Sequence, residues 1–397
     1  MSYLQETQDA GREIFPDLAR AFALFGICLV NVGIMSWPMM TGYGESAVHD
    51  PVDQSAFFAV SALFMAKSYT LFSFMFGVGF AYQMRSAESK GVGFAGRYWR
   101  RIIGLLAFGL INVAFLFQGD ILIMYAILGS ILFLFRNASP RRLSGWAISV
   151  YAIQVLFVAA MALSFWAWES FDPENFTLKM GLMMEQADTA ADAFRTGSLG
   201  DTIGQRFADW SGFITFGMLM QGLGAFAFFL FGFSAVKRGT IANPAAPFWK
   251  RSRHVFLPIG LLISGAGAWV ILQGHGSMNP TMMAGMTLIM LGSPFSTAGY
   301  LGLIAKWAET PGGTVKTFLA RGGTSSLTAY LMQSLILSLI FCSYGLGLYG
   351  QIGAAGCIAI ALATGLFTIA FSSIWRTKFK RGPMEALLRS WTYMGAR

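Results

Sequence analysis

The sequence predicts an all-α integral membrane protein, a polytopic bundle of about ten transmembrane helices with both termini in the cytoplasm. Of its 397 residues, 55% are hydrophobic and only 12% are charged, and the mean hydropathy is +0.57. A typical soluble domain carries about 25% charged residues. The apolar residues gather in long runs, and the basic residues fall between alternate runs. This composition excludes a soluble enzyme and a disordered chain, and the three cysteines do not form a disulfide framework.

The apolar runs set the number of spans, because a transmembrane helix needs about 20 mostly apolar residues to cross about 30 Å of hydrocarbon. Ten candidate spans lie at about 16–38, 56–84, 98–118, 121–136, 145–168, 209–236, 254–273, 281–305, 324–342 and 353–375. The second run is long enough to be tilted or broken. The third and fourth runs are joined only by Gln118, Gly119 and Asp120, which predicts a tight antiparallel hairpin.

The positions of lysine and arginine orient these spans. With ten spans, 24 of the 28 basic residues fall on one side. The opposite loops hold only Lys179, Arg195 and Arg206, and Lys67 lies within a span. Cytoplasmic loops are enriched in Lys and Arg, so both termini are expected in the cytoplasm of a bacterium, with the protein in its inner membrane. The net charge of +9 then reflects orientation in the lipid bilayer, and no nucleic-acid partner is expected.

A long acidic loop divides the chain into two halves. Residues 1–168 form a first half with five spans and the candidate site, and residues 209–397 form a second half with five spans. The linker at 169–208 is expected outside the membrane, with an amphipathic helix over about 176–194. The polar first fifteen residues lack the basic start of a signal peptide, so the first span is expected to be retained.

Lys67 is the outstanding ionisable residue within a span, where a charge costs about 2.5–3.5 kcal/mol at the centre. One interpretation is an inward-facing cation that neutralises a substrate carboxylate or phosphate, or pairs with Asp120. The alternative is that the span begins near Lys67 and that the ammonium group snorkels to the outer interface.

Three further polar residues share the depth of Lys67 in the outer half of the membrane: Asn31 on the first span, Asn112 on the third and Asp120 at the start of the fourth. A shared depth is the minimum condition for a common polar cavity. The alternative for Asp120 is a helix N-cap, and the alternative for the two asparagines is hydrogen bonding between helices.

Histidine is scarce in this sequence. His49 and His275 fall in short outer loops, and His254 lies beside an inner basic cluster. His49 is a candidate general base, since Asp50 and Asp53 lie close to it in the chain; the alternative is a solvated loop histidine. No spacing of His, Cys and carboxylate residues predicts a metal site.

Several stretches resemble the YeiB-like family of bacterial membrane proteins. In the first half they are 17–31 (DLARAFALFGICLVN), 71–80 (LFSFMFGVGF), Arg100-Arg101 and 119–122 (GDIL). In the second half, 328–334 (TAYLMQS), 344–351 (YGLGLYGQ) and 381–385 (RGPME) are similar to the family's C-terminal domain of unknown function. The resemblance therefore covers both halves.

YeiB-like proteins are in turn similar to transmembrane acyltransferases, among them heparan-α-glucosaminide N-acetyltransferase and bacterial polysaccharide O-acyltransferases. The O-acyltransferases carry a catalytic histidine eleven residues after the first-span arginine. This sequence has Asn31 there, and it has Asn112 where YeiB-like proteins commonly carry a histidine.

The resemblance implies an enzyme that moves an acyl group from cytoplasmic acyl-CoA, such as acetyl-CoA, to an envelope sugar or a small alcohol or amine. Basic residues near the inner surface would bind the donor phosphates: Arg20, Arg97, Arg100 and Arg101. Asn31 and Lys67 would polarise the thioester, and His49 or Asp120 would take the acceptor's proton. The alternative is a non-enzymatic transporter of an anionic solute or a membrane scaffold. The sequence leaves open whether the chain forms a homo-oligomer.

Overall fold

The computed structural model describes residues 13–39, 41–274 and 278–394, and the N-terminal arm up to residue 12 and His275 lie outside these ranges. The described ranges fold into helices without any β-strand, which confirms the predicted all-α class. The helices of the first half are α2 (Ile14–Ser36), α3 (Gly44–Ala47), α4 (Pro51–Leu63), α5 (Lys67–Ser89), α6 (Phe94–Phe115), α7 (Ile121–Leu132) with η1 (Phe133–Phe135), and α8 (Pro140–Phe171). The remaining helices are α9 (Pro173–Arg195), α10 (Leu199–Gly217), η2 (Met218–Gly222), α11 (Leu223–Lys237), α12 (Pro247–Arg251), η3 (Ser252–Phe256), α13 (Leu257–Gln273), α14 (Pro280–Glu309), α15 (Thr314–Gly323), α16 (Ser326–Phe341), α17 (Ala354–Lys378) and α18 (Pro383–Thr392).

Each of the ten predicted spans overlaps one of these helices or helix runs. Among the described residues, eight runs are long and apolar enough to cross a membrane. The pair α15 and α16 would count as a ninth run if it is one broken span, and it is bent by 82° at its break. The fourth predicted span corresponds to the short apolar helix Ile121–Phe135. The predicted linker helix is α9.

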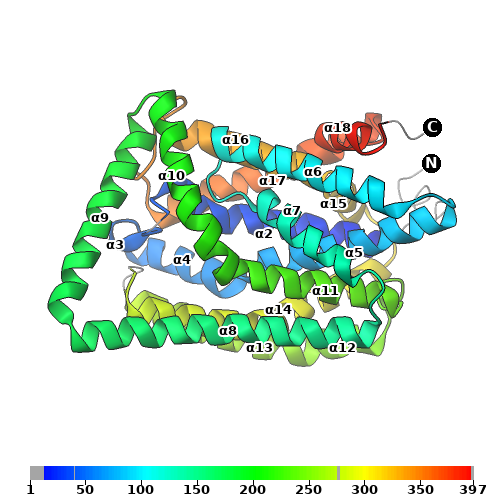
Figure 1. The fold of residues 1–397 in the computed structure, drawn as a ribbon, viewed down its shortest axis with the longest axis horizontal. Helices are drawn as coiled ribbons and strands as arrows, with labels where there is room; N and C mark the ends of the chain where they lie inside the picture. Colours follow the sequence, from blue (N-terminus) through cyan, green and yellow to red (C-terminus); the bar gives the residue numbers. More distant parts are fainter. Residues whose placement is uncertain (1–12, 40, 275–277, 395–397) are drawn as a thin grey trace.

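The helices lie roughly side by side, and α9 crosses one end of the bundle (Figure 1). The opposite end holds α18 (Figure 1). We call this the basic end, because α17 and α18 bring Arg376, Lys380, Arg381 and Arg389 to it. The other end is called the α9 end.

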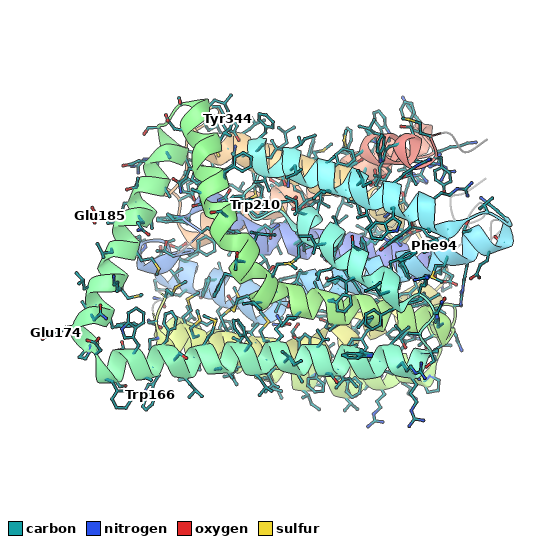
Figure 2. The ribbon with its side chains drawn as sticks, viewed as in Figure 1. Phe94, Trp166, Glu174, Glu185, Trp210 and Tyr344 are labelled. Atoms are coloured by element: carbon teal, nitrogen blue, oxygen red, sulfur yellow. The ribbon has the colours of Figure 1, made fainter. Side chains whose placement is uncertain are left out.

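Burial separates the helices of the core from those that face lipid. In α2, 67% of the most apolar window is buried, whereas in α8 the corresponding share is only 17%. The exposed side chains of α8 include Trp146, Leu156 and Trp166, the last of which points away from the bundle in Figure 2. An apolar helix that buries so little of itself needs hydrocarbon around it. The bundle therefore requires a lipid bilayer.

The two halves of the sequence interlock. Helix α2 packs against α15, α16 and α17, and α5 packs against α11. A Cβ added at Gly77 would clash with the carbonyl oxygen of Phe229, and one added at Gly232 would clash with that of Phe74. Only glycine allows such close backbone approach between two helices. A Cβ added at Gly79, in contrast, would meet no atom within 4 Å, and this glycine lines a cavity instead.

Candidate functional site

A large polar cavity opens at the basic end, and we call it the basic cavity. It consists of two parts, of about 510 and 420 Å³, which share Phe72, Phe76, Gln83, Arg101, Thr324, Ser326 and Glu385 as lining residues. One part reaches Asp17 and Arg20 on α2, and the other reaches Tyr125 on α7 and Tyr330 on α16. The cavity therefore runs from the charged surface to the buried start of α7.

Cations outnumber anions on the walls of the basic cavity. The cationic residues are Arg20, Arg101, Arg376, Lys380, Arg381 and Arg389, and the anionic residues are Glu13, Asp17 and Glu385. Arg20 Nη1 lies 2.9 Å from Asp17 Oδ1. The guanidinium group of Arg101, which lines both parts, has no hydrogen bond or ion pair to another described residue. A concave wall with this excess of positive charge favours an anionic ligand.

The break between α15 and α16 shapes this cavity, and Glu385 of α18 stabilises it. Its carboxylate accepts hydrogen bonds from the backbone N–H of Leu327 (2.6 Å) and Thr328 (3.2 Å), and from the Thr328 hydroxyl (2.6 Å). These are orphan donors of the first turn of α16, so Glu385 replaces the missing helical acceptors. The helix can then start inside the bundle, which places Thr324 and Ser326 on the cavity wall.

A buried hydrogen-bond cluster closes the deep end of the cavity. Asp120 Oδ2 accepts from Asn112 Nδ2 at 2.7 Å and from the Tyr330 hydroxyl at 3.3 Å, and Asp120 Oδ1 accepts from the N–H of Ile123 at 3.0 Å. Asn112, Asp120 and Tyr330 are each at most 2% exposed. The sequence placed Asn112 and Asp120 at the same depth in the membrane, and in the structure their side chains form a hydrogen bond. Asp120 also acts as the N-cap of α7, so the capping alternative is correct as well.

Asn31 lies beside this cluster and lines a small central cavity of about 70 Å³. Gly119 and Ile121, the neighbours of Asp120, line the same cavity, and so do Ala66 and Ser68, the neighbours of Lys67. The four predicted residues therefore surround one region, although their side chains do not meet in a single pocket.

Lys67 is the first residue of α5, after a break in the helix. It is 1% exposed, and its Nζ donates to the carbonyl oxygen of Ser61 at 3.3 Å. Ala66 takes a left-handed conformation with φ of 63°, and its carbonyl oxygen accepts from the hydroxyl of Ser293 at 3.0 Å. This burial rules out a snorkelling ammonium group. No described carboxylate lies within 4.0 Å of Nζ, so the expected pairing with Asp120 is not present.

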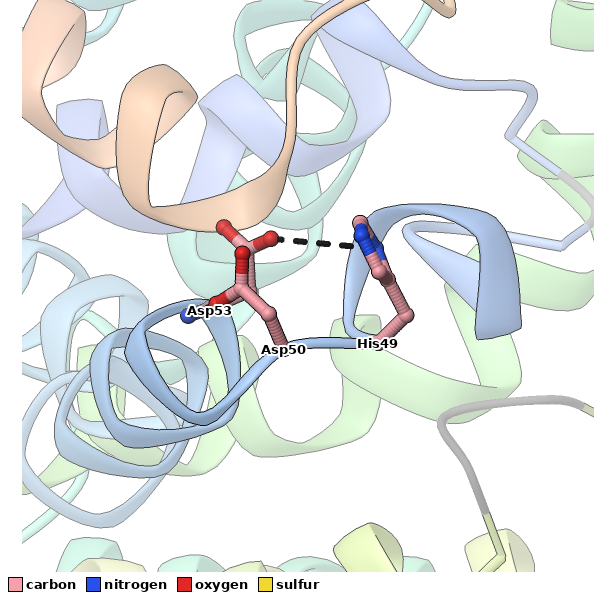
Figure 3. Close-up of side chains that lie close together, drawn as sticks. All are labelled: His49, Asp50 and Asp53. Carbon is pink, nitrogen blue, oxygen red and sulfur yellow. Dashed lines mark hydrogen bonds and ion pairs between the residues drawn. The ribbon is translucent and has the colours of Figure 1, made fainter.

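His49 lies at the α9 end, with a side chain that is 66% exposed. It faces Asp53 (Figure 3), and its Nδ1 is 4.0 Å from Asp53 Oδ2. Asp53 is buried and its Oδ1 accepts from the N–H of Ala355 at 2.7 Å, so the carboxylate is held by the first turn of α17. The carboxylate of Asp50 caps α4, and its hydrogen bonds from the backbone N–H of Asp53 and Val52 lower its pKa. Asp53 and His49 thus form a carboxylate–histidine pair. Together with Asp50 they offer three possible metal-ligand atoms within 4.8 Å of one another, a grouping that the spacing in the sequence did not predict.

A second large cavity, of about 710 Å³, lies at the α9 end, and we call it the methionine groove. Met180, Met183 and Met184 line it from α9, and Trp37, Tyr43 and Met278 line it from other parts of the chain. Glu174 and Glu185, which also belong to α9, do not line it. Both lie on the side of α9 that faces away from the bundle (Figure 2).

Comparison with known proteins places this architecture in a family. A family model described as "Protein of unknown function (DUF418)" matches residues 235–395. The "Uncharacterized protein YxaH" of Bacillus subtilis (strain 168) is 33% identical over 411 aligned residues, which cover 99% of this chain and 97% of the relative. The chain belongs to the DUF418 family of YeiB-like proteins.

Two further relatives agree with this assignment. The "Uncharacterized protein YeiB" of Escherichia coli (strain K12) is 25% identical, and the alignment covers 97% of both chains. The "Uncharacterized 39.9 kDa protein in amylase 3'region" of Bacillus acidopullulyticus is 39% identical over 28% of this chain and 31% of its own length. No solved structure matches the chain.

In this YeiB-like protein, two of the four arginines predicted to bind the donor line the basic cavity, namely Arg20 and Arg101. The other two contact the residues that follow α18: the guanidinium group of Arg97 lies 5.0 Å from the ring centre of Tyr393, and Arg100 donates to the carbonyl oxygen of Met394. Sequence reasoning missed the cavity residues of the second half: Tyr330, Arg376, Lys380, Arg381, Glu385 and Arg389. The family stretches 328–334 and 381–385 were the signal that could have found three of them, namely Tyr330, Arg381 and Glu385.

Proposed function

We propose that this YeiB-like protein is a transmembrane acyltransferase of the bacterial inner membrane, which transfers an acyl group from cytoplasmic acyl-CoA to an acceptor bound at the α9 end. One observation supports it above the others: three cavities follow α2 from end to end. The basic cavity meets α2 at Asp17 and Arg20, the central cavity meets it at Asn31, and the methionine groove begins at Trp37. At about 1.5 Å per residue this helix spans about 35 Å, which is enough to cross a hydrocarbon core of about 30 Å.

The basic cavity suits the donor. The phosphates of acyl-CoA carry several negative charges, and arginine binds phosphate through paired N–H donors. Arg101, Arg381 and Arg389 would hold these phosphates at the mouth, and the acyl thioester would extend toward Tyr125 and Tyr330.

The proposed reaction is attack of the acceptor's amine or hydroxyl on the thioester carbonyl carbon. A new C–N or C–O bond forms, the C–S bond breaks, and CoA leaves as a thiolate. His49, oriented by Asp53, would take the acceptor's proton, which is then returned to the thiolate. Asn31 would stabilise the oxyanion. Lys67, which donates to the carbonyl oxygen of Ser61, would hold the break between α4 and α5 next to Asn31. Asn112 and Asp120 would hold the wall between the donor and acceptor ends.

Ligand-dependent stabilisation tests the donor site. Acetyl-CoA at a hundredfold excess over its Kd should stabilise the purified protein in detergent by about 2.7 kcal/mol, read as a higher melting temperature. The double variant Arg101→Ala with Arg381→Ala should lose this stabilisation. The matched control is Arg141→Ala with Arg142→Ala, which removes two exposed cations outside the basic cavity and should keep the effect. No stabilisation at millimolar acetyl-CoA would overturn the proposal.

Transport of an anionic solute is the second candidate, favoured by the interrupted helices α4–α5 and α15–α16. Proteoliposomes separate the two functions. With acetyl-CoA inside and an amine outside, an acyltransferase yields acylated amine outside and free CoA inside, whereas a transporter of a small anionic solute yields neither product. His49→Ala should abolish transfer but keep donor binding, and His254→Ala should affect neither.

A further inference from the structure

The methionine groove differs in chemistry from every other cavity described above. We propose that it binds the acyl acceptor, and that this acceptor is an amphiphile with a long apolar chain and a primary amine head group. The inference rests on the proposed acyltransferase function and names its second substrate class.

The apolar lining fits a flexible chain. Met180, Met183 and Met184 stand at i, i+3 and i+4 on α9 and so share one face of that helix, and Met278 lines the groove from the segment before α14. Methionine is unbranched and has three rotatable bonds, so a methionine surface adapts to an apolar guest of variable shape. A free sugar, which is covered by hydroxyl groups, would leave these four thioethers without apolar partners.

The charged groups of the groove select the head group. Asp188 and Asp192 line it one helical turn apart, and Asp192 is paired with Arg195. Asp188 has no hydrogen bond or ion pair to any other described residue. An ammonium group at Asp188 would gain a charge-assisted hydrogen bond, whereas a carboxylate or phosphate would be repelled.

Tyr43 adds a second polar partner. Its side chain is 9% exposed and lines the groove, and its hydroxyl is buried without a partner among the described residues. A buried hydroxyl left unpaired is costly, so a head group that reached it would gain a hydrogen bond. The carboxylate–histidine pair of Asp53 and His49 follows Tyr43 in the chain, and in the proposed reaction it would take the proton of the bound amine.

Binding of octylamine to the protein in phosphatidylcholine nanodiscs tests the inference, with empty nanodiscs as the background for partitioning into lipid. Octylamine should bind more tightly than octanol, octanoate or glucosamine. Asp188→Asn should weaken octylamine binding about tenfold and leave octanol unchanged, since one charge-assisted hydrogen bond is removed. Glu185→Gln, on the same helix but outside the groove, is the matched control and should have no effect.

A separate variant tests the apolar wall. Met180→Ser with Met183→Ser should weaken octylamine and octanol alike, because the chain and not the head group loses its contacts. Equal octylamine affinity in the wild type and in Asp188→Asn overturns the inference, and so does glucosamine binding that exceeds octylamine binding. These measurements need no acyl-CoA: octylamine binding without donor-dependent stabilisation would reject the acyltransferase and keep the amine site.

Discussion

The two ends of the bundle carry cavities of opposite character. The basic cavity draws its charge from α2, α6, α17 and α18 and has arginine and lysine on its walls. The methionine groove draws its lining from α9 and the segment after α2, and it has thioethers and aspartates. Membrane insertion places basic residues at one end in any case. Only some of these basic residues also line a cavity: Arg101 and Arg381 line the basic cavity, whereas Arg141 and Arg142 do not.

The largest expected effect concerns the wall between the two ends. Asp120→Ala leaves Asn112, Tyr330 and the N–H of Ile123 without their acceptor inside the bundle. A buried donor without a partner costs about 1–3 kcal/mol, so we expect a loss of about 3 kcal/mol in the free energy of unfolding. The midpoint of SDS-induced unfolding in mixed micelles measures this loss.

The control variant for Asp120→Ala changes a residue at the α9 end. Asp188→Ala removes an exposed carboxylate without described partners and should change the free energy of unfolding by no more than about 0.5 kcal/mol. If the two variants had equal unfolding midpoints, Asp120 would have no special role in separating the cavities.

A smaller effect on stability distinguishes the packed contact between α5 and α11 from the wall of the basic cavity. Gly77→Ala places a Cβ against the backbone of α11 and should destabilise the protein by about 2 kcal/mol through overpacking. Gly79→Ala adds a Cβ where no atom lies within 4 Å, and alanine's higher helix propensity should make it neutral or stabilising by up to about 1 kcal/mol. The same unfolding assay measures both. A destabilising Gly79→Ala would mean that α5 packs more closely at the cavity than the structure shows.

The smallest effect is a pH dependence confined to the α9 end. The folded-state pKa of Asp50 lies below its ordinary value of 3.8, because the ionised carboxylate accepts the N–H groups at the start of α4. A lowered folded pKa contributes stability above the ordinary pKa, and that contribution is lost as the pH falls through the folded pKa. Hydrogen exchange in the first turn of α4 should therefore be faster in Asp50→Ala than in the wild type at neutral pH. This difference should shrink below pH 3.8. A difference that persisted unchanged in acid would show that the charge of Asp50 does not matter for this cap.

Depth along the spans predicted one contact of the candidate site. Counting residues along the spans placed Asn112 and Asp120 at one level, and they form a hydrogen bond. Depth carries no information on helix rotation, which is why Lys67 was expected near Asp120 but points to Ser61 instead. The contribution of α18 was also hidden, because Glu385 and Arg381 are far from α6 in sequence and reach the cavity only through the packing of the second half against the first.

The sequence by itself determined the membrane class, the helical content, the ten hydrophobic segments and the separation of charge between the two ends. These properties follow from local composition, because hydrocarbon excludes charges and requires internal hydrogen bonding of the backbone. Only the tertiary structure decided which of the polar groups share a cavity. Helix rotation, the breaks before Lys67 and Ser326 and the interlocking of the two halves depend on contacts between residues distant in the chain, as in the close approach at Gly77.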